Sequence, residues 1–502
     1  MQKRQVLINA IFSVIQILVI GIVIFVLYRF LLDTIGVKQL GIWSLVLATT
    51  SMAQIANFGL SGSVVKFVAK YLARDESKKV PEVIQTAVIS LGIFVGLILL
   101  VSYPLIKKVL VSVVPDDFLP LALSILPYAL LALWLMMIFS VFQAGLDGCQ
   151  RIDSRSVVLM GSSILNLFLC FILVPSYGLM GVAYARVLQM SIILSVTWVL
   201  LKRYIRLPVI PCRWNKQLFK EIVRYGVKYQ TISVTIMFYD PITKALLSKF
   251  GGLSMVGYYE MANRMVQQFR AIIVSANQVL FPAIADLKEK EPEKIHSVYQ
   301  TSYQLLFYLA LPMYSLIIVS LPLISRLWIG RYESIFVIFG ILLTVGRFLN
   351  TLAGPAYFAY LGIGELRWNV VSHLTTAILN LLLGFLLGFY FGGNGVVIAW
   401  AISLALGSNI ICLSYHIRYK IPLIELVPKS SRATSIICLI GILFTLIIYH
   451  KLIHNFNAMI LNSSLILSFL VIIFIPLWLH PMRKRLIGWV TNELLNRKQG
   501  VG

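Results

Sequence analysis

Charged side chains lie within stretches of this sequence that are otherwise apolar. The acids among them are Asp240 and Glu260. The cations are Arg29, Arg186, Arg224, Lys228, Lys244, Arg264, Arg270 and Arg347. In a bilayer a charged side chain costs at least about 2.5 kcal/mol, so it needs a partner or a polar cavity. A cavity with surplus positive charge suits an anion, and arginine can hold phosphate through two parallel hydrogen bonds.

Pairing accounts for only part of this charge. Glu260 and Arg264 are four residues apart and share one helical face, as do Asp240 and Lys244. Two further cations are expected to extend to the cytoplasmic interface: Arg224 and Lys228. We therefore expect a cationic cavity for a phosphate-bearing anion, with Asp240 and Glu260 as candidates for ion coupling. The cations expected to line this cavity are Arg29, Lys244, Arg264, Arg270, Arg347 and Arg186.

The apolar stretches that hold these residues exclude an ordinary soluble enzyme. Of the 502 residues, 59% are hydrophobic and 12% are charged, whereas soluble domains average roughly 45–50% and 25%. The sequence predicts an all-α polytopic membrane protein with about 14 transmembrane helices. They are expected near 8–31, 40–61, 83–103, 119–145, 157–175, 179–201, 222–248, 253–283, 299–321, 334–361, 370–391, 395–416, 433–450 and 460–480.

The net charge of +24 carries information about orientation. With the N-terminus in the cytoplasm, 28 Lys and Arg residues fall on that side of the predicted spans and 7 on the other. The positive-inside rule then places both termini in the cytoplasm. The loops between the predicted spans are short and leave no room for a soluble catalytic domain. Gly36–Gly41 lacks the Lys-Ser/Thr ending that a nucleotide-binding loop needs.

Neither a metal site nor a cofactor is expected. The five cysteines have no paired spacing and are expected to be free thiols: Cys149, Cys170, Cys212, Cys412 and Cys438. His450 and His454 have helical spacing but no third ligand nearby. No feature of the sequence predicts nucleic-acid binding.

The sequence contains an internal repeat. Residues 164–185 match residues 378–399 at an offset of 214, with 11 identities in 22 positions that include Asn166/Asn380 and Gly178/Gly392. Residues 31–41 also match 246–257, starting at an offset of 215 and with one inserted residue. At that offset Arg29 corresponds to Lys244, which predicts one cation at the same depth in each copy.

The repeat predicts two six-helix lobes in parallel pseudo-repeat, at 1–205 and 206–420, with two additional helices and a basic cytoplasmic tail at 421–502. An even number of spans separates the copies, so we expect an axis along the membrane normal and a substrate path between the lobes.

Several short motifs lie along the chain: Leu40-Gly-Ile-Trp43, Asn57-Phe-Gly-Leu60, Val65-Lys-Phe-Val-Ala69, Pro175-Ser-Tyr-Gly178 and Val256-Gly-Tyr-Tyr259 followed by Phe281-Pro282. Together they resemble the Wzx-type polysaccharide flippases, a branch of the multidrug/oligosaccharidyl-lipid/polysaccharide exporter superfamily with a MATE-like fold. The resemblance extends over essentially the whole chain. The second copy of the hairpin departs from the pattern, because Phe389 replaces the proline.

The resemblance implies a flippase of the bacterial cytoplasmic (inner) membrane. It would move a polyprenyl-diphosphate-linked oligosaccharide, such as an O-antigen, capsule or exopolysaccharide repeat unit, from the inner to the outer leaflet by alternating access. A polysaccharide polymerase and chain-length machinery are the protein partners it implies. Substrate-specific residues vary within the family, so none is transferred to this chain.

Two other functions stay open at this point. An ion-coupled multidrug or metabolite antiporter of the same fold would favour acids in its cavity, opposite to the surplus of cations here. A membrane-embedded polymerase or glycosyltransferase would need carboxylates in a large outer loop, where only Asp116 and Asp117 occur.

Overall fold

The computed structural model describes residues 3–51, 59–205, 208, 213–277, 280–452 and 457–488. The described residues form helices joined by short turns and contain no strand. The chain divides into two compact units, of which the first comprises Met1–Gln268 and Ala377–Ala399 and the second Phe269–Thr376 and Trp400–Gly502. The predicted all-α architecture is confirmed.

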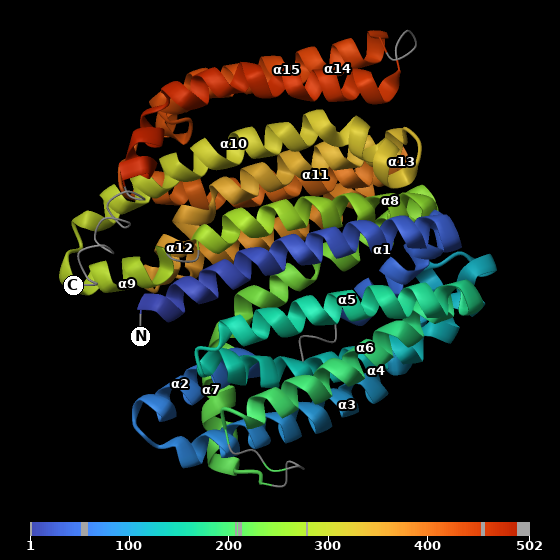
Figure 1. The fold of residues 1–502 in the computed structure, drawn as a ribbon, viewed down its shortest axis with the longest axis vertical. Helices are drawn as coiled ribbons and strands as arrows, with labels where there is room; N and C mark the ends of the chain where they lie inside the picture. Colours follow the sequence, from blue (N-terminus) through green and yellow to red (C-terminus); the bar gives the residue numbers. More distant parts are fainter. Residues whose placement is uncertain are drawn as a thin grey trace. The chain divides into compact units, whose positions relative to one another are not determined.

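The first unit contains the N-terminal helices and parts of two long ones. In it α1 runs beside α5, and α4 packs against α3 and α6 (Figure 1). Its elements are α1 (Lys3–Ser51), α2 (Leu60–Ala73), η2 (Ser77–Lys79), α3 (Val80–Val113), η3 (Asp116–Phe118), α4 (Leu119–Gly148), α5 (Ile152–Tyr177), α6 (Leu179–Lys202), α7 (Lys216–Met237), α8 (Tyr239–Asn277) as far as residue 268, and residues 377–399 of α13 (Arg367–Arg418).

The second unit contains the end of α8, the two flanks of α13 and the C-terminal helices. Here α14 and α15 form an antiparallel hairpin that packs along α10 (Figure 1). The remaining elements are α9 (Leu280–Lys290), α10 (Lys294–Ile329), α11 (Ser334–Leu352), α12 (Gly354–Ile363), η4 (Leu423–Leu426), η5 (Lys429–Ser431), α14 (Arg432–Leu452) and α15 (Ala458–Leu479).

Helix length and hydropathy agree with the predicted spans. Ten helices of the described chain are long and apolar enough to cross a membrane. The apolar part of α1 has 41 residues and α13 has 52, and at 1.5 Å per residue both exceed twice the roughly 30 Å hydrocarbon thickness. Each therefore holds two predicted spans, and the ten helices account for twelve of the fourteen. The other two fall on α7 and α8, where charged residues lower the hydropathy.

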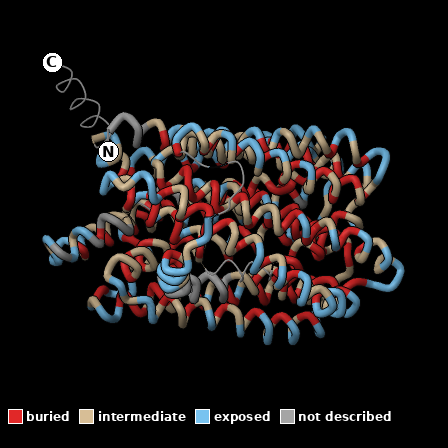
Figure 2. Tube along the Cα trace, turned by 90° about the horizontal axis from the view of Figure 1, so that it is seen from below, coloured by how far each residue is buried: buried red, intermediate tan, exposed pale blue. Residues whose placement is uncertain are grey.

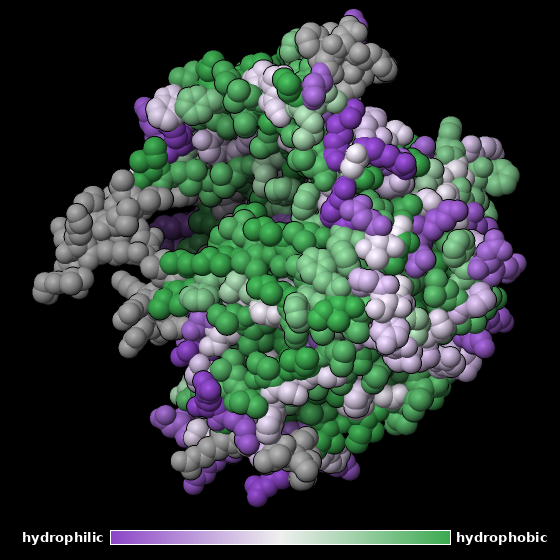
Figure 3. Space-filling view, turned by 45° about the vertical axis from the view of Figure 1, so that its right-hand side comes forward, coloured by the Kyte–Doolittle hydropathy of each residue, from purple (hydrophilic) through white to green (hydrophobic). Residues whose placement is uncertain are grey.

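The surface is consistent with this assignment. Figure 3 shows broad areas of hydrophobic side chains, with hydrophilic side chains gathered in separate groups. Buried residues follow the inward sides of the helices, whereas many outer turns are exposed (Figure 2). Exposed apolar residues of this kind, such as Leu100 and Phe389, suit contact with lipid.

Glycines at the helix bends reproduce the sequence repeat in the backbone. Gly178 has φ 54° and ψ −133°, and Gly392, 214 residues later, has φ 62° and ψ −149°. The bend in α1 at Gly36 has φ 77° and ψ 166°, and the bend in α8 has φ 78° and ψ 173° at Gly252. The repeated hairpins therefore share their backbone conformation.

The second match shows that one predicted correspondence is wrong. The residue equivalent to Gly36 is Gly252, so the offset at this bend is 216 and not 215. Counted back along the helix, Lys244 is eight residues before the bend, level with Tyr28 and not with Arg29. The lobe boundaries at 205 and 420 stay predictions.

Two glycines bring the second half of α1 against the second half of α8. A Cβ at Gly41 would meet the carbonyl of Leu253, and a Cβ at Gly257 would meet the carbonyl of Val37. The two contacts are equivalent in the repeat, because an offset of 216 relates Gly41 to Gly257 and Val37 to Leu253. The backbones thus cross in close, nearly symmetric contact, which places Ser44 opposite its equivalent residue, Glu260.

Replacing Gly36 with alanine is expected to lower the free energy of unfolding by about 1–3 kcal/mol, because its φ and ψ are essentially restricted to glycine. No atom lies within 4 Å of the added Cβ, so the cost is conformational and not steric. Gly21→Ala is the matched control, because Gly21 also has open space around it but is helical. Unfolding of the purified variants in detergent measures the difference. Equal stability of the two variants would contradict the glycine-specific backbone conformation at Gly36.

Candidate functional site

The carboxylate of Glu260 is the centre of a buried polar network in the first unit. Its side chain is 3% exposed. Oε1 accepts from Tyr28 Oη at 3.0 Å and from Arg264 Nε at 2.7 Å, and Oε2 accepts from Ser44 Oγ at 2.9 Å. Lys244 Nζ lies 2.7 Å from Oε2. Four donors from α1 and α8 thus occupy the acceptor positions of one carboxylate.

Lys244 joins Glu260 to a second carboxylate. Its side chain is 4% exposed, and Nζ lies 2.9 Å from Asp240 Oδ2. Asp240 is more accessible, at 43% exposed, and Oδ1 accepts from Tyr259 Oη and Asn263 Nδ2, both at 3.3 Å. Both predicted pairs, Asp240–Lys244 and Glu260–Arg264, are therefore confirmed, and Lys244 links them.

Asn380 holds the start of α8 in position. Its Nδ2 donates to the carbonyl of Tyr239 at 3.3 Å and to Thr243 Oγ1 at 3.0 Å. The chain interrupts its helix at Phe238, and Pro241 falls in the first turn of α8, where its missing N–H is not needed. This break sets the direction in which Asp240 and Lys244 enter the unit.

Arg186 and Arg264 line two cavities of the first unit. One, of about 200 Å³, is also lined by Tyr28, Asn166 and Gln189. The other, of about 280 Å³, is also lined by Asp240 and Lys244. The Arg264 side chain is 45% exposed although its Nε is held by the buried Glu260, so its terminal nitrogens face open space.

Arg186 has most of its donors available. Its Nη1 donates to Gln189 Oε1 at 2.8 Å, and Gln189 Nε2 in turn donates to the carbonyl and hydroxyl of Ser162 at 3.0 and 2.8 Å. A guanidinium has five N–H donors, and this contact uses one. Three cations (Lys244, Arg264 and Arg186) and two carboxylates leave the cluster one positive charge in excess.

Arg29 is not among these residues. Its Nε lies 2.8 Å from Asp33 Oδ2, in a half-exposed pair. At 100° per residue, Arg29 points roughly opposite to the stripe of α1 that lines the first cavity. That stripe is Ile20, Val23, Ile24, Leu27, Tyr28 and Leu31. Asp33 is the partner that the sequence analysis overlooked, and the role of Arg29 stays a prediction.

Arg270 and Arg347 belong to the second unit. Arg270 Nη2 donates to Asn350 Oδ1 at 3.0 Å, and Asn350 Nδ2 donates to Ser408 Oγ at 2.9 Å. The Arg347 guanidinium lies 5.0 Å from the centre of the Trp400 ring. The structure thus gives both residues polar or aromatic neighbours within this unit.

Tyr28 and Ser44 were missed by sequence reasoning. Each is a single hydroxyl in an apolar run, a pattern that is common in membrane helices. The signal that could have found them is the repeat at its correct offset, which pairs Tyr28 with Lys244 and Ser44 with Glu260.

Some predictions concern residues that the structure describes only in part. Cys149, Cys170, Cys412 and Cys438 are free thiols, whereas Cys212, His454 and Asn57 lie outside the described residues, as does the side chain of Lys228. Within the described ranges, no group of three or more His, Cys, Asp or Glu residues could hold a metal ion.

Glu260→Gln is expected to destabilise the protein by roughly 3–5 kcal/mol, because it leaves Lys244 and Arg264 short of a buried counter-charge. Adding Lys244→Met is expected to recover part of this loss. The matched control is Glu365→Gln, which breaks a pair with Arg418 that is about 40% exposed and is expected to cost less than about 1 kcal/mol. Equal effects of the two Gln variants on unfolding in detergent would contradict the network.

Known proteins resemble this chain in sequence and in fold. Residues 6–288 match the family described as "Polysaccharide biosynthesis protein". A protein of Shigella flexneri named "Putative O-antigen transporter" is 23% identical over 391 residues, which cover 75% of this chain and 90% of that protein.

Two solved structures show the same fold. An inward-facing multidrug resistance transporter of the MATE family has a TM-score of 0.71 at 17% identity, covering 80% of this chain and 94% of its own. The lipid II flippase MurJ in an inward closed conformation has a TM-score of 0.66 at 13% identity, covering 94% and 98%. The chain is thus a multi-pass membrane protein with a MATE-like fold, and it belongs to the polysaccharide biosynthesis protein family that includes the Wzx-type flippases.

Proposed function

We propose that this protein is a flippase for a polyprenyl-diphosphate-linked oligosaccharide. It moves the lipid-linked sugar from the cytoplasmic to the outer leaflet of a bacterial cytoplasmic membrane by alternating access, and supplies a polysaccharide polymerase and its chain-length machinery. Family membership supports the substrate class. The observation that carries the proposal is the pair of guanidinium groups, Arg186 and Arg264, which line two cavities of a membrane-embedded unit.

The arrangement suits a diphosphate in particular. Glu260 holds Arg264 through Nε, which leaves the terminal nitrogens directed into the cavity. Arg186 is held by one hydrogen bond to Gln189 and also has donors to offer. Two arginines of fixed orientation can donate paired hydrogen bonds to two adjacent phosphate groups.

The cavity sizes limit what is bound there. At about 200 and 280 Å³, each is smaller than the 300–1,000 Å³ usual for drug-sized ligands. They suit the diphosphate, not the oligosaccharide or the polyprenyl chain. The site is therefore proposed as the phosphate-binding part of a larger path, in which Lys244 acts through Glu260 to orient Arg264.

The membrane potential supports movement in the proposed direction. An inside-negative potential drives an anion outward, and an anion whose charge crosses the field unpaired gains about 2.3 kcal/mol per charge per 100 mV. Binding by arginines lowers the cost of bringing that charge into the membrane.

Of the two carboxylates considered for ion coupling, Asp240 is the better candidate. Its side chain is 43% exposed and lines the larger cavity. Glu260 has four donors and is almost completely buried, so protonating it would break several interactions at once.

The test is translocation of a fluorescent polyprenyl-diphosphate oligosaccharide in proteoliposomes. Arg186→Gln together with Arg264→Gln is expected to lower the rate at least about tenfold, because each charge-assisted hydrogen bond contributes about 1.5–3 kcal/mol. Arg203→Gln with Arg367→Gln is the control, since it removes the same charge from exposed positions on helix ends. Thermal unfolding of each variant separates a loss of transport from a loss of folding.

Unchanged transport by the Arg186/Arg264 variant would contradict the proposed site. Transport of a soluble organic cation in place of the lipid would favour the antiporter, whose fold is shared. The single variants Arg29→Gln, Arg270→Gln and Arg347→Gln test the remaining predicted cations in the same assay.

A further inference from the structure

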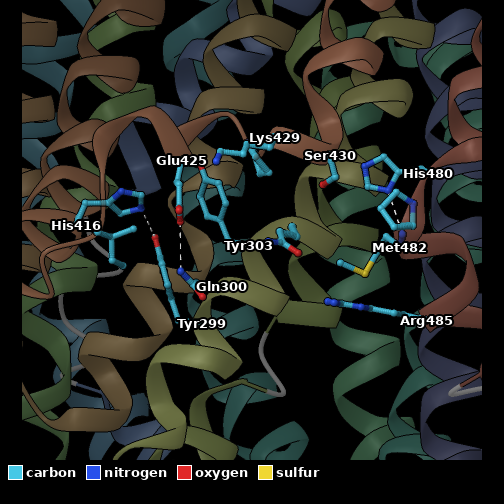
Figure 4. Close-up of a pocket in the computed structure, with 14 residues that line it drawn as sticks. Tyr299, Gln300, Tyr303, His416, Glu425, Lys429, Ser430, His480, Met482 and Arg485 are labelled. Atoms are coloured by element: carbon cyan, nitrogen blue, oxygen red, sulfur yellow. Dashed lines mark hydrogen bonds between the residues drawn. The ribbon is translucent and has the colours of Figure 1, made fainter.

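A separate cavity of about 370 Å³ lies in the second unit. It is bounded by the first turns of α10, the end of α13, the segment from η4 to η5, and the residues that follow α15 (Figure 4). The α14–α15 hairpin begins and ends at this cavity, because η5 leads into α14 and residues 480–485 leave α15. No step of the proposed transport uses it.

The wall formed by α10 is fixed by hydrogen bonds to the linker and to α13. Tyr299 Oη and His416 Nε2 are 3.0 Å apart, and Tyr303 Oη donates to the carbonyl of Leu426 at 3.0 Å. Gln300 Nε2 donates to Glu425 Oε2 at 3.2 Å. The carboxylate of Glu425, the acidic residue of this wall, therefore already accepts a hydrogen bond from Gln300, which a dashed line marks in Figure 4.

The opposite wall is fixed by His480. The backbone N–H of Met482 donates to His480 Nδ1 at 3.2 Å, so that nitrogen carries no proton. The ring is therefore neutral, with its proton on Nε2, and it donates to Ser431 Oγ at 3.0 Å. Burial lowers the pKa of His480, which favours the same neutral form. The histidine is thus a structural link between η5 and the end of α15.

Lys429 and Arg485 differ from the other polar residues of this cavity. The side chain of neither residue forms a hydrogen bond or an ion pair within the described part of the chain. Figure 4 shows them on different sides of the cavity, with Ser430 next to Lys429. Two cations with no acidic partner and a hydroxyl group face one space, which is the donor set that a phosphate group takes.

The end of α15 indicates the depth of this cavity in the membrane. Trp478 is 55% exposed, its ring stacks on Phe474, and the Arg483 guanidinium lies 3.9 Å from the Trp478 ring centre. Exposed tryptophan beside arginine marks the level of the lipid headgroups. The residues that line the cavity begin two positions later, at His480.

We propose that this cavity binds the phosphodiester headgroup of an anionic phospholipid of the cytoplasmic leaflet. Arg485 and Lys429 bind its phosphate oxygens, and Ser430 donates a hydrogen bond. Because the two cations come from the two ends of the hairpin, a bound headgroup holds both ends of α14–α15 beside α10. Basic residues at the cytoplasmic end of a membrane helix attract anionic lipids by the same physics. The position of the cavity at the level of the headgroups favours a lipid phosphate over a free phosphate from solution.

The experiment is native mass spectrometry of the purified full chain in detergent with equimolar phosphatidylglycerol and phosphatidylcholine. The wild type is expected to retain phosphatidylglycerol in preference. Lys429→Gln with Arg485→Gln is expected to reduce that retention about tenfold, as loss of a charge-assisted hydrogen bond predicts. Lys420→Gln with Lys484→Gln removes the same charge from exposed neighbours outside the cavity and is expected to retain the lipid.

A second variant tests the cavity itself. Ser430→Phe fills part of the space without a change of charge and is expected to lower retention of phosphatidylglycerol as well. Thermal unfolding without added lipid checks that each variant is folded.

Three results would overturn the proposal. The wild type could show no preference between the two lipids, or the two double variants could lose the lipid equally, which would mean attraction by net charge alone. Displacement of the lipid by millimolar inorganic phosphate would assign the site to a free anion. These outcomes are independent of transport, so failure of the flippase assay leaves this test intact.

Discussion

The constraint on which the first unit depends is the burial of the Glu260 carboxylate in a membrane helix. A lone buried carboxylate is too costly to be retained, and this one is held by four donors on two helices. Those donors can converge only because Gly41 and Gly257 allow the two backbones to cross without side chains between them. The close helix contact and the buried charge therefore depend on each other.

The repeat explains where the network lies. Positions 28 and 244 are equivalent, and both side chains bind the same carboxylate. Positions 44 and 260 are also equivalent, and they bind each other across the helix crossing. One copy thus supplies hydroxyl groups where the other supplies a lysine and a glutamate. The charged site thus lies where the two equivalent segments cross, and Arg186 and Arg264 present its excess positive charge.

Hydropathy and helical spacing predicted most of the fold and part of the site. Twelve of the fourteen expected spans lie on apolar helices, and both pairs at a spacing of four residues form. The match of 31–41 with 246–257 needs one inserted residue, and the register was wrong by one because composition did not show that this residue precedes the bend at Gly36 and Gly252. One residue turns a helix by 100°, and that is enough to place Arg29 on the far face of α1 and Tyr28 on the near one. The convergence of Tyr28 and Ser44 on Glu260 depends on a helix crossing that no local pattern encodes.

The most direct test of the account is a structure of the protein with a polyprenyl diphosphate bound. We predict phosphate oxygens within hydrogen-bond distance of the Arg186 and Arg264 guanidinium groups, with Glu260 still bound to Lys244. Phosphates bound elsewhere, with the cavities beside these two arginines filled only by water, would contradict the central claim.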